Sequence, residues 1–225
     1  MRVAEDEAHA AIPRPDVSDA GRRLAPHHEG RGATSGKKRP AQDAAPMNDV
    51  SPIRIARPMQ LSETGLVIDY FLNATPEYLD SLGVDPTRVP KRDAWRARFE
   101  QQFALPVDQR NIVLVLWELD GEPTGFSSSD RIKLGEEAYM HLHILDPDRR
   151  QKGNGAIFVR KTAKLYFEML RIKRLFCEPY ALNVAPNRTL QAAGFKYVKT
   201  HETVPGPMNF HQPVTRWMIE REAMV

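Results

Sequence analysis

The chain has 225 residues, of which 41% are hydrophobic and 27% are charged, so it can bury the core of an ordinary globular domain. Its formal net charge of +3 is too small to indicate binding to nucleic acid or to an anionic membrane. No apolar run approaches the roughly 18 residues that cross a bilayer. The single cysteine, Cys177, excludes an intramolecular disulfide and fits a reducing cytoplasm, where we expect the protein.

The composition changes near Met47. Residues 1–46 contain no aromatic side chain, and Leu and Ile occur there only as Leu24 and Ile12. Such a segment cannot bury enough apolar surface to offset its ordering entropy. We therefore predict a disordered tail over 1–46 and one folded domain over 47–225. Met47 is an alternative start of the natural protein, and the sequence does not decide between the two.

The first elements of the folded part are a strand and three helices. Apolar and polar residues alternate over 53–57, which is typical of a strand. Ser62 is a candidate cap for the first helix, Pro76 opens the second, and Gly83 ends it. The three helices are expected over 62–73, 77–82 and 91–103.

Strands dominate the rest of the chain. Residues 111–119 are almost continuously apolar, as in a central strand, and Asp120-Gly121 predicts a hairpin to a partner strand. Further strands are expected over 123–129, 138–145, 174–179, 197–204 and 214–221, with helices over 154–172 and 187–193. This order predicts an α/β (α+β) fold, with a central mixed, mostly antiparallel sheet of about seven strands and helices on both faces.

The segment 145–156 leaves a strand and opens a helix. Gly153 and Gly155 allow a tight turn, so that free N–H groups at the helix start point at one place. Together with the positive helix end and the neighbouring Arg149, Arg150 and Lys152, these donors suit a pyrophosphate. The alternative is a plain glycine turn. A dinucleotide fingerprint lacks its third glycine here, and a Walker loop lacks its Gly-Lys-Ser/Thr.

Two blocks together carry a family resemblance. The run 147–155, Pro-Asp-Arg-Arg-Gln-Lys-Gly-Asn-Gly, resembles the Arg/Gln-x-x-Gly-x-Gly/Ala signature of the GNAT acetyl-CoA-dependent N-acetyltransferases. The block 183–195, which runs from Asn183 to Gly194-Phe195, resembles the other motif of that family. A helix and a strand separate the blocks, as in the family. The resemblance spans about 53–220 and implies a V-shaped split between strands four and five.

The resemblance implies acetyl-CoA as the co-substrate. Its pantetheine arm would enter the split, and its pyrophosphate would lie on the backbone N–H groups of about 151–156. Asn183 and Asn187 match polar positions near the arm, with helix capping as the alternative for both. The expected cofactor-binding residues are Leu145, Arg150, Gln151, Lys152, Gly153, Asn154, Gly155, Ala156, Asn183 and Asn187.

Transfer to an amine needs a base, an oxyanion donor and a proton for the leaving thiolate. His141 and His143 share one strand face and are the first base candidates, and Glu178 is the third. The resemblance implies that the end of this strand lies beside the thioester, which would make His143 the nearer of the two histidines. Each has a structural alternative, as a wall residue or an ion-pair partner. The resemblance places the oxyanion donor among the N–H groups of 143–145. The tyrosine that many GNAT enzymes use to protonate the thiolate corresponds to Leu190.

We therefore expect an enzyme that transfers the acetyl group directly to a primary amine, with a small amine or amino-acid-like acceptor favoured over a protein. Candidate acceptor contacts are Tyr70, Asn73, Tyr139 and Tyr180, with packing as the alternative for the aromatic rings. The rival hypothesis is a non-catalytic acyl-CoA-binding or regulatory module, in keeping with the missing tyrosine. An RNA-directed acetyltransferase rests only on the basic cluster 37–39. No metal site is expected. The acceptor, the base and the oligomeric state, a homodimer included, stay open.

Overall fold

A computed structural model describes residues 51–145 and 153–224 of the chain. All described residues belong to one compact unit, and the predicted tail over 1–46 lies outside the described residues. Within the described ranges, no helix combines the length and the apolar character needed to cross a membrane.

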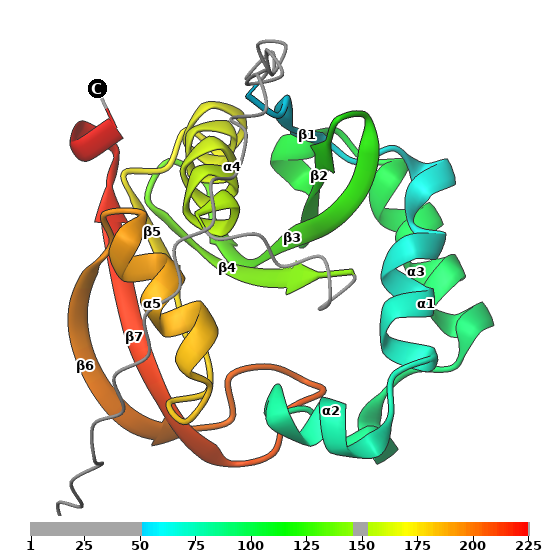
Figure 1. The fold of residues 1–225 in the computed structure, drawn as a ribbon. Coiled ribbons are helices and arrows are strands. Elements are labelled where there is room, and N and C mark those ends of the chain that lie inside the picture. Colours follow the sequence, from blue (N-terminus) through cyan, green and yellow to red (C-terminus); the bar gives the residue numbers. More distant parts are fainter. Residues whose placement is uncertain (1–50, 146–152, 225) are drawn as a thin grey trace, which may run out of the picture. The chain divides into compact units, whose positions relative to one another are not determined.

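Seven strands form one sheet in the order β1-β2-β3-β4-β5-β7-β6 (Figure 1). Their bounds are β1 Arg54–Pro58, β2 Val113–Leu119, β3 Glu122–Lys133, β4 Glu137–Ile144, β5 Arg174–Cys177, β6 Lys196–Thr203 and β7 Gln212–Glu220. Only β4 and β5 run parallel, and every other neighbouring pair is antiparallel. The predicted mixed, mostly antiparallel sheet is confirmed.

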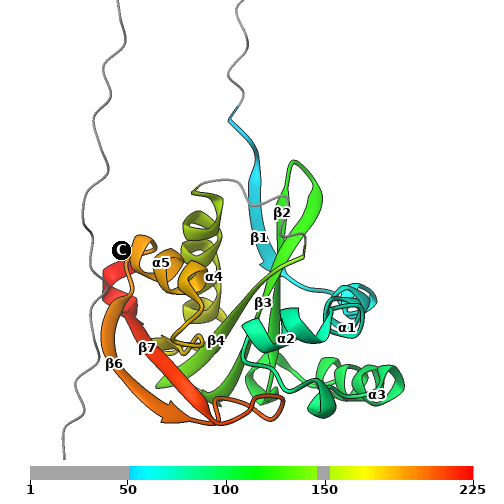
Figure 2. The same cartoon turned by 60° about the horizontal axis from the view of Figure 1, so that its bottom comes forward.

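Within the described residues, five α-helices flank the sheet (Figures 1 and 2). They are α1 Gly65–Leu72, α2 Pro76–Ser81, α3 Arg92–Phe103, α4 Asn154–Leu170 and α5 Val184–Ala192, with short 3-10 turns η1 Leu61–Glu63, η2 Pro86–Arg88, η3 Val107–Gln109 and η5 Arg221–Met224. The start of the first predicted helix was wrong, because the turn η1 precedes α1. There the Gln60 N–H donates to the Glu63 carboxylate at 2.8 Å, in the manner of a helix cap, and Ser62 has no such role.

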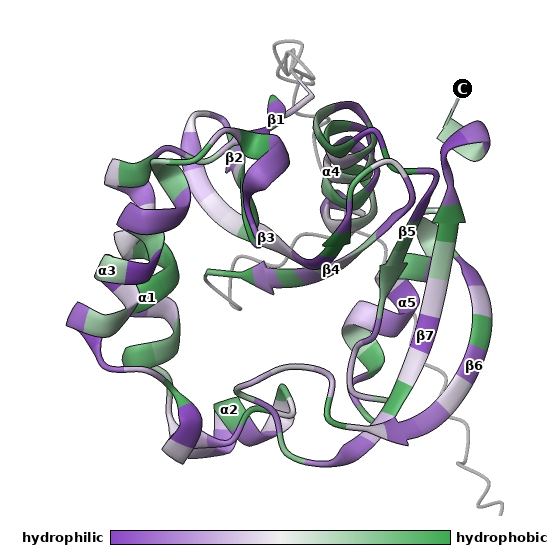
Figure 3. Cartoon of the chain, turned by 180° about the vertical axis from the view of Figure 1, so that it is seen from behind, coloured by the Kyte–Doolittle hydropathy of each residue, from purple (hydrophilic) through white to green (hydrophobic). Residues whose placement is uncertain are grey.

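The central strand β2 builds two hydrophobic cores, because its successive side chains point to opposite faces. Val115 and Trp117 join the core under α4, whereas Leu114 and Leu116 join the core under α1 and α3. This explains the continuous apolar run in the sequence. Figure 3 shows β5 as largely hydrophobic, whereas β6 and β7 are interrupted by hydrophilic residues.

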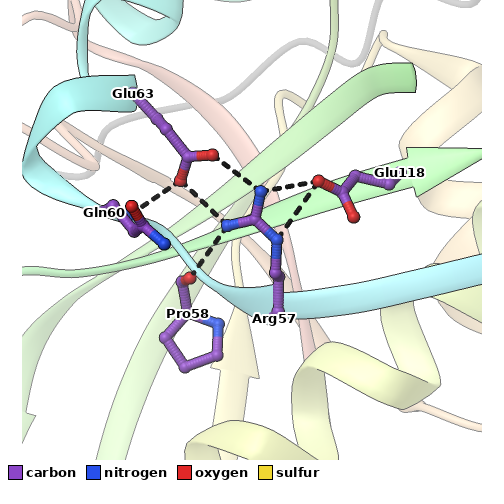
Figure 4. Close-up of polar contacts among 5 residues, drawn as sticks. All are labelled: Arg57, Pro58, Gln60, Glu63 and Glu118. Atoms are coloured by element: carbon purple, nitrogen blue, oxygen red, sulfur yellow. Dashed lines mark hydrogen bonds and ion pairs between the residues drawn. The ribbon is translucent and has the colours of Figure 1, made fainter. Parts of the chain in front are cut away.

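An arginine fixes the start of the helical layer. The Arg57 guanidinium of β1 contacts Glu63 of η1 and Glu118 of β2, each at 2.6 Å (Figure 4). The hydrogen bond from Arg57 is the main cause that holds the pKa of Glu63 below its usual range, ahead of the opposing effect of burial. Because one planar cation is shared by two carboxylates, the entry to α1 is tied to two strands at once.

The segment after α2 is bonded to the loop between β6 and β7, and the two lie side by side in Figures 1 and 2. The Gly83 carbonyl accepts hydrogen bonds from Asn209 Nδ2 at 2.7 Å and from Gln212 Nε2 at 2.9 Å. The Asp85 N–H donates to the Met208 carbonyl at 2.8 Å. Gly83 has a φ of +75°, and a Cβ there would collide with the Gln212 amide.

We predict that Gly83→Ala lowers the free energy of unfolding by about 2–4 kcal/mol, because it adds left-handed backbone strain to a clash with Gln212. Gly135→Ala is the matched control, since Gly135 has a φ of +78° and its added Cβ would meet no atom within 4 Å. It should lose about 1–2 kcal/mol, the backbone strain alone. Urea denaturation measures both. Equal losses in the two variants would show that the contact with Gln212 contributes nothing to the free energy of unfolding.

Candidate active site

The parallel strands β4 and β5 pair over only part of β4. Their register ends with Met140 opposite Cys177, although β4 continues along β3 to Ile144. Shortly after β5 comes Pro179, which has no N–H to offer a neighbouring strand. The Pro179 carbonyl accepts from the Thr215 N–H of β7 at 3.1 Å, so the chain stays with β7. The sheet therefore opens between the end of β4 and the residues after β5.

A groove lies on the α4 and α5 side of this opening and has a volume of about 310 Å³. We call it the α4–α5 groove. Its walls come from the end of β4, the first turn of α4 and one side of α5, and they include Leu142, Ile144, Gly153, Gly155, Pro186 and Thr189. The predicted acceptor contact Tyr70 of α1 also lines this groove.

The two glycines at the start of α4, Gly153 and Gly155, are required for different structural reasons. Gly155 faces α5, and a Cβ there would come within 3.2 Å of the Thr189 side chain, so the close packing of the two helices needs a glycine. Gly153 has a φ of +91°, and its added Cβ would meet no protein atom within 4 Å. Gly153 is therefore required because its backbone is left-handed, and the space beside it is open to a ligand.

The predicted phosphate-binding loop is described only in part. Gly153, Asn154, Gly155 and Ala156 all line the α4–α5 groove, and they carry the first N–H groups of α4, which have no acceptor within the helix. Asn154 Oδ1 accepts from Arg54 Nε of β1 at 2.6 Å, which anchors this turn to the sheet edge. The predicted Arg150, Gln151 and Lys152 lie outside the described residues.

A second hollow, of about 240 Å³, lies on the opposite side of the opening. We call it the aromatic cavity, because its inner wall carries Phe71, Trp95, Phe99 and Phe126. The β6–β7 loop and the first residues after β5 close its other side. Both hollows are lined by Leu82, Leu142, Asn183 and Pro186, so they meet where β4 and β5 part.

His143 lines the aromatic cavity and packs among aromatic rings. Its ring stacks on Phe126 at 4.7 Å between centroids and lies edge-on to Tyr70 and Phe71, each at 5.2 Å. Its Nδ1 is buried and has no hydrogen-bond partner among the described residues. Burial, and then the charge of His141, lower the pKa of His143 to about 3. The imidazole is therefore neutral at pH 7 and a weak proton acceptor.

His141 has a partner of a different kind. Its Nε2 lies 3.2 Å from Asp130 Oδ1, its side chain is 27% exposed, and both residues line the aromatic cavity. Burial alone would raise the pKa of Asp130, but the hydrogen bond and charge of His141 and the charge of Arg131 lower it. Asp130 therefore stays ionised and can orient the imidazole. Asp130 was not among the site residues predicted from the sequence. The antiparallel register of β3 and β4, which pairs Ser128 with His141, is the signal that identifies it.

Glu178, the third base candidate, belongs to an ion-pair network. Its side chain is 1% exposed and contacts Arg216 Nε at 2.6 Å and Arg131 Nη1 at 2.9 Å, with His201 Nε2 at 3.5 Å. Burial would raise the pKa of Glu178, but the bonds from Arg216 and Arg131 hold it below its usual range. The Arg131 guanidinium also covers the ring of Tyr139 at 3.5 Å. Glu178 is thus a firmly held anion, and Tyr139 lies in this network and lines neither hollow.

The remaining predicted residues divide between the site and the scaffold. Tyr180 and Asn183 line the aromatic cavity. The Asn187 amide is engaged inside the protein, because it donates to the Asn183 carbonyl at 2.8 Å and accepts from the Trp217 indole at 2.8 Å. Asn73 is exposed at the end of α1 and lines neither hollow.

Leu145, Leu190 and Cys177 complete the surroundings of the opening. The Leu145 N–H donates to the Thr124 carbonyl at 3.0 Å, so it is occupied within the sheet. Leu190 is fully buried in the core under α4. Cys177 is buried too, and burial raises the pKa of its thiol well above its usual range. Among the described residues, no group of three His, Cys, Asp or Glu side chains could hold a metal ion.

The strand order, the parted parallel strands and the glycine turn that opens α4 match the fold of solved GNAT acetyltransferases, as the resemblance in the sequence implies. No family model and no curated protein matches the sequence. Solved structures match the fold at low identity. One is RimL, a ribosomal L7/L12 alpha-N-protein acetyltransferase in complex with coenzyme A, with a TM-score of 0.61 and 15% identity over 76% of this chain and 95% of that one.

Two further solved structures are those of acetyltransferases named for other acceptors. The spermidine N-acetyltransferase from Vibrio cholerae, in complex with CoA and spermine, has a TM-score of 0.61 and 13% identity over 76% of this chain and 97% of that one. The aminoglycoside acetyltransferase AAC(6')-Ib, in complex with coenzyme A, has a TM-score of 0.57 and 16% identity over 76% of this chain and 96% of that one.

We predict that Glu178→Gln lowers the free energy of unfolding by about 2 kcal/mol at pH 7, since two arginines lose their buried anion. The folded-state pKa of Glu178 is depressed, so its contribution is complete above the unfolded value of about 4.3 and is lost as the pH falls below it. The difference in the free energy of unfolding between wild type and variant should therefore be smaller at pH 4 than at pH 7. Urea denaturation at pH 7 and pH 4 measures it, with the exposed Glu168→Gln as control. A difference that grew on acidification would contradict the ion-pair assignment.

Proposed function

We propose that the protein is an acetyl-CoA-dependent N-acetyltransferase that transfers the acetyl group directly to a primary amine. One observation carries this proposal: the α4–α5 groove and the aromatic cavity reach the opening from opposite sides and share Leu142, Asn183 and Pro186. Two substrates bound in these hollows could meet there without an intermediate carrier. Low-identity structural neighbours that hold CoA support the same function.

The α4–α5 groove offers donor chemistry that suits acetyl-CoA. The first N–H groups of α4 and its positive end suit the pyrophosphate. The open space beside Gly153 leaves room for the phosphates, and the groove between Ile144 and Thr189 would take the pantetheine arm. Bound there, acetyl-CoA supplies an activated acyl carbon at the opening.

We assign the base to His141, with Asp130 as its orienting partner. Attack by the amine forms a C–N bond, the C–S bond breaks, and the proton of the amine passes to His141. Asp130 remains ionised and stabilises the imidazolium that results. His143 and Glu178, the other two candidates, suit the role less well, because the first has a pKa of about 3 and the second is held by two arginines.

The backbone of β4 would supply the oxyanion donor. The Leu145 N–H points to β3, where it meets the Thr124 carbonyl. Because N–H groups alternate between the two edges of an antiparallel strand, those of Leu142 and Ile144 point to the opposite edge, toward the opening. Leu190 has no proton to give to the thiolate. Tyr180, one of the predicted acceptor contacts, lines the aromatic cavity, and we propose its hydroxyl as the donor.

The rival function is a non-catalytic acyl-CoA-binding or regulatory module. The leucine at position 190 favours it, since many enzymes of this fold have a tyrosine there. Release of CoA thiol in the presence of a panel of amines separates the two. An enzyme releases thiol in proportion to the acetylated amine, whereas a module binds acetyl-CoA and releases none.

We predict that Gly153→Val weakens acetyl-CoA binding at least about tenfold, because a branched residue cannot adopt a φ of +91° and its side chain would fill the space beside the phosphates. Gly135→Val is the control, because Gly135 also has a positive φ and open space but lies in the β3–β4 hairpin. It should leave the affinity unchanged. Calorimetric titration of acetyl-CoA into both folded variants measures the affinities. If Gly153→Val binds acetyl-CoA as tightly as the wild type, the groove is not the cofactor site.

We predict that His141→Gln lowers kcat by about 10²-fold or more while acetyl-CoA affinity stays within about twofold, as expected for a lost general base. Asp130→Asn should lower kcat less, since the imidazole remains. The exposed His211→Gln is the control and should be neutral. If His143→Gln abolished turnover in a stably folded protein and His141→Gln did not, the base would have to be reassigned to His143.

A further inference from the structure

The charges around the aromatic cavity restrict the kind of amine that it can hold. The two carboxylates in its lining are Asp130 and Glu178. Both are already committed, because Asp130 faces Arg131 and His141 and Glu178 is bonded to Arg131 and Arg216. A polycationic acceptor would therefore find no uncommitted anion among the described lining residues.

The lining carries cations instead. Arg88 and Arg98 both line the aromatic cavity. Arg88 is partly engaged, with Asp85 Oδ2 at 3.1 Å and the Asn209 carbonyl at 2.7 Å. Arg98 of α3 is exposed and makes no hydrogen bond or ion pair with any residue that the structure describes. An arginine at the edge of an apolar cavity is suited to a carboxylate, which it can bind through two parallel hydrogen bonds.

The inner wall is apolar and aromatic. Phe71 and Trp95 lie 5.3 Å apart between ring centroids, Trp95 and Phe99 lie 6.4 Å apart, and Phe126 is also buried. This wall suits the apolar or aromatic body of a ligand.

We propose that the acceptor is an amino-carboxylate with an apolar or aromatic body, whose anionic group binds Arg98. This inference rests on the proposed function, because it assigns the acceptor class of the same site. The amine of such a molecule would lie at His141 and Asp130, its body would lie against the aromatic wall, and its carboxylate would offset the positive charge at the cavity edge. The same charges disfavour polycationic acceptors such as polyamines and aminoglycosides.

The test uses pairs of amines that differ in the carboxylate alone. The pairs are 4-(aminomethyl)benzoate with benzylamine, and L-phenylalanine with phenethylamine, and spermidine is the polycation. For at least one pair, kcat/KM of the carboxylated member should exceed that of its partner at least about fivefold, and spermidine should be the poorest substrate. In Arg98→Gln this ratio should fall to within about twofold of unity. Arg96→Gln is the matched control on the same helix, since Arg96 is exposed and does not line the cavity.

A binding measurement separates this inference from the proposed function. The Kd of each carboxylated probe is measured calorimetrically on protein saturated with CoA, for wild type, Arg98→Gln and Arg96→Gln. If no amine is acetylated but the Arg98→Gln variant alone loses affinity at least about fivefold, the ligand class stands and the enzyme assignment fails. If the members with and without the carboxylate bind and react alike, if spermidine is preferred, or if Arg98→Gln keeps the preference, the proposed acceptor class is wrong.

Discussion

The arrangement of the site depends on a constraint of backbone pairing between β4 and β5. Parallel strands stay together only while each residue can meet the hydrogen-bonding groups of its neighbour. Pro179 cannot donate, and the chain around it remains paired with β7, so contact with β4 ends at Met140 and Cys177. The last residues of β4 then have one edge open. α5 begins shortly beyond, and this places a groove and a cavity on the two sides of the same opening.

Electrostatics distinguish the two sides of this opening. On the groove side, the chain offers backbone N–H groups at the start of α4. On the cavity side, two carboxylates share Arg131, whose own backbone is left-handed, with a φ of 46° at an irregularity of β3. Such a conformation is costly for a residue with a side chain. In return, one guanidinium reaches Asp130 and Glu178 together, and Asp130 is held where it can face His141.

The sequence predicted most of the fold because its signals are local. Three such signals are the continuous apolar run of β2, the alternation of β4 and the glycine turn before α4. Each depends only on residues that are close together in the sequence. The site depends more on contacts between residues that are far apart in the sequence. Alternation placed His141 and His143 on one face, but it could not show that α1 surrounds His143 with aromatic rings. The partnership of His141 with Asp130 depends on the register of a hairpin, and the place of Arg98 at the cavity depends on how α3 packs. Both are set by tertiary structure.

The buried cysteine at the end of β5 has a practical consequence. A thiol reacts with disulfide dyes only as an accessible thiolate, and Cys177 is 3% exposed, with a pKa that burial raises. Such a dye would therefore detect CoA released by the folded protein with little background from the protein itself. Since the chain has one cysteine, any slow additional signal could reach at most one equivalent per chain, and it would count the molecules that have unfolded during the assay.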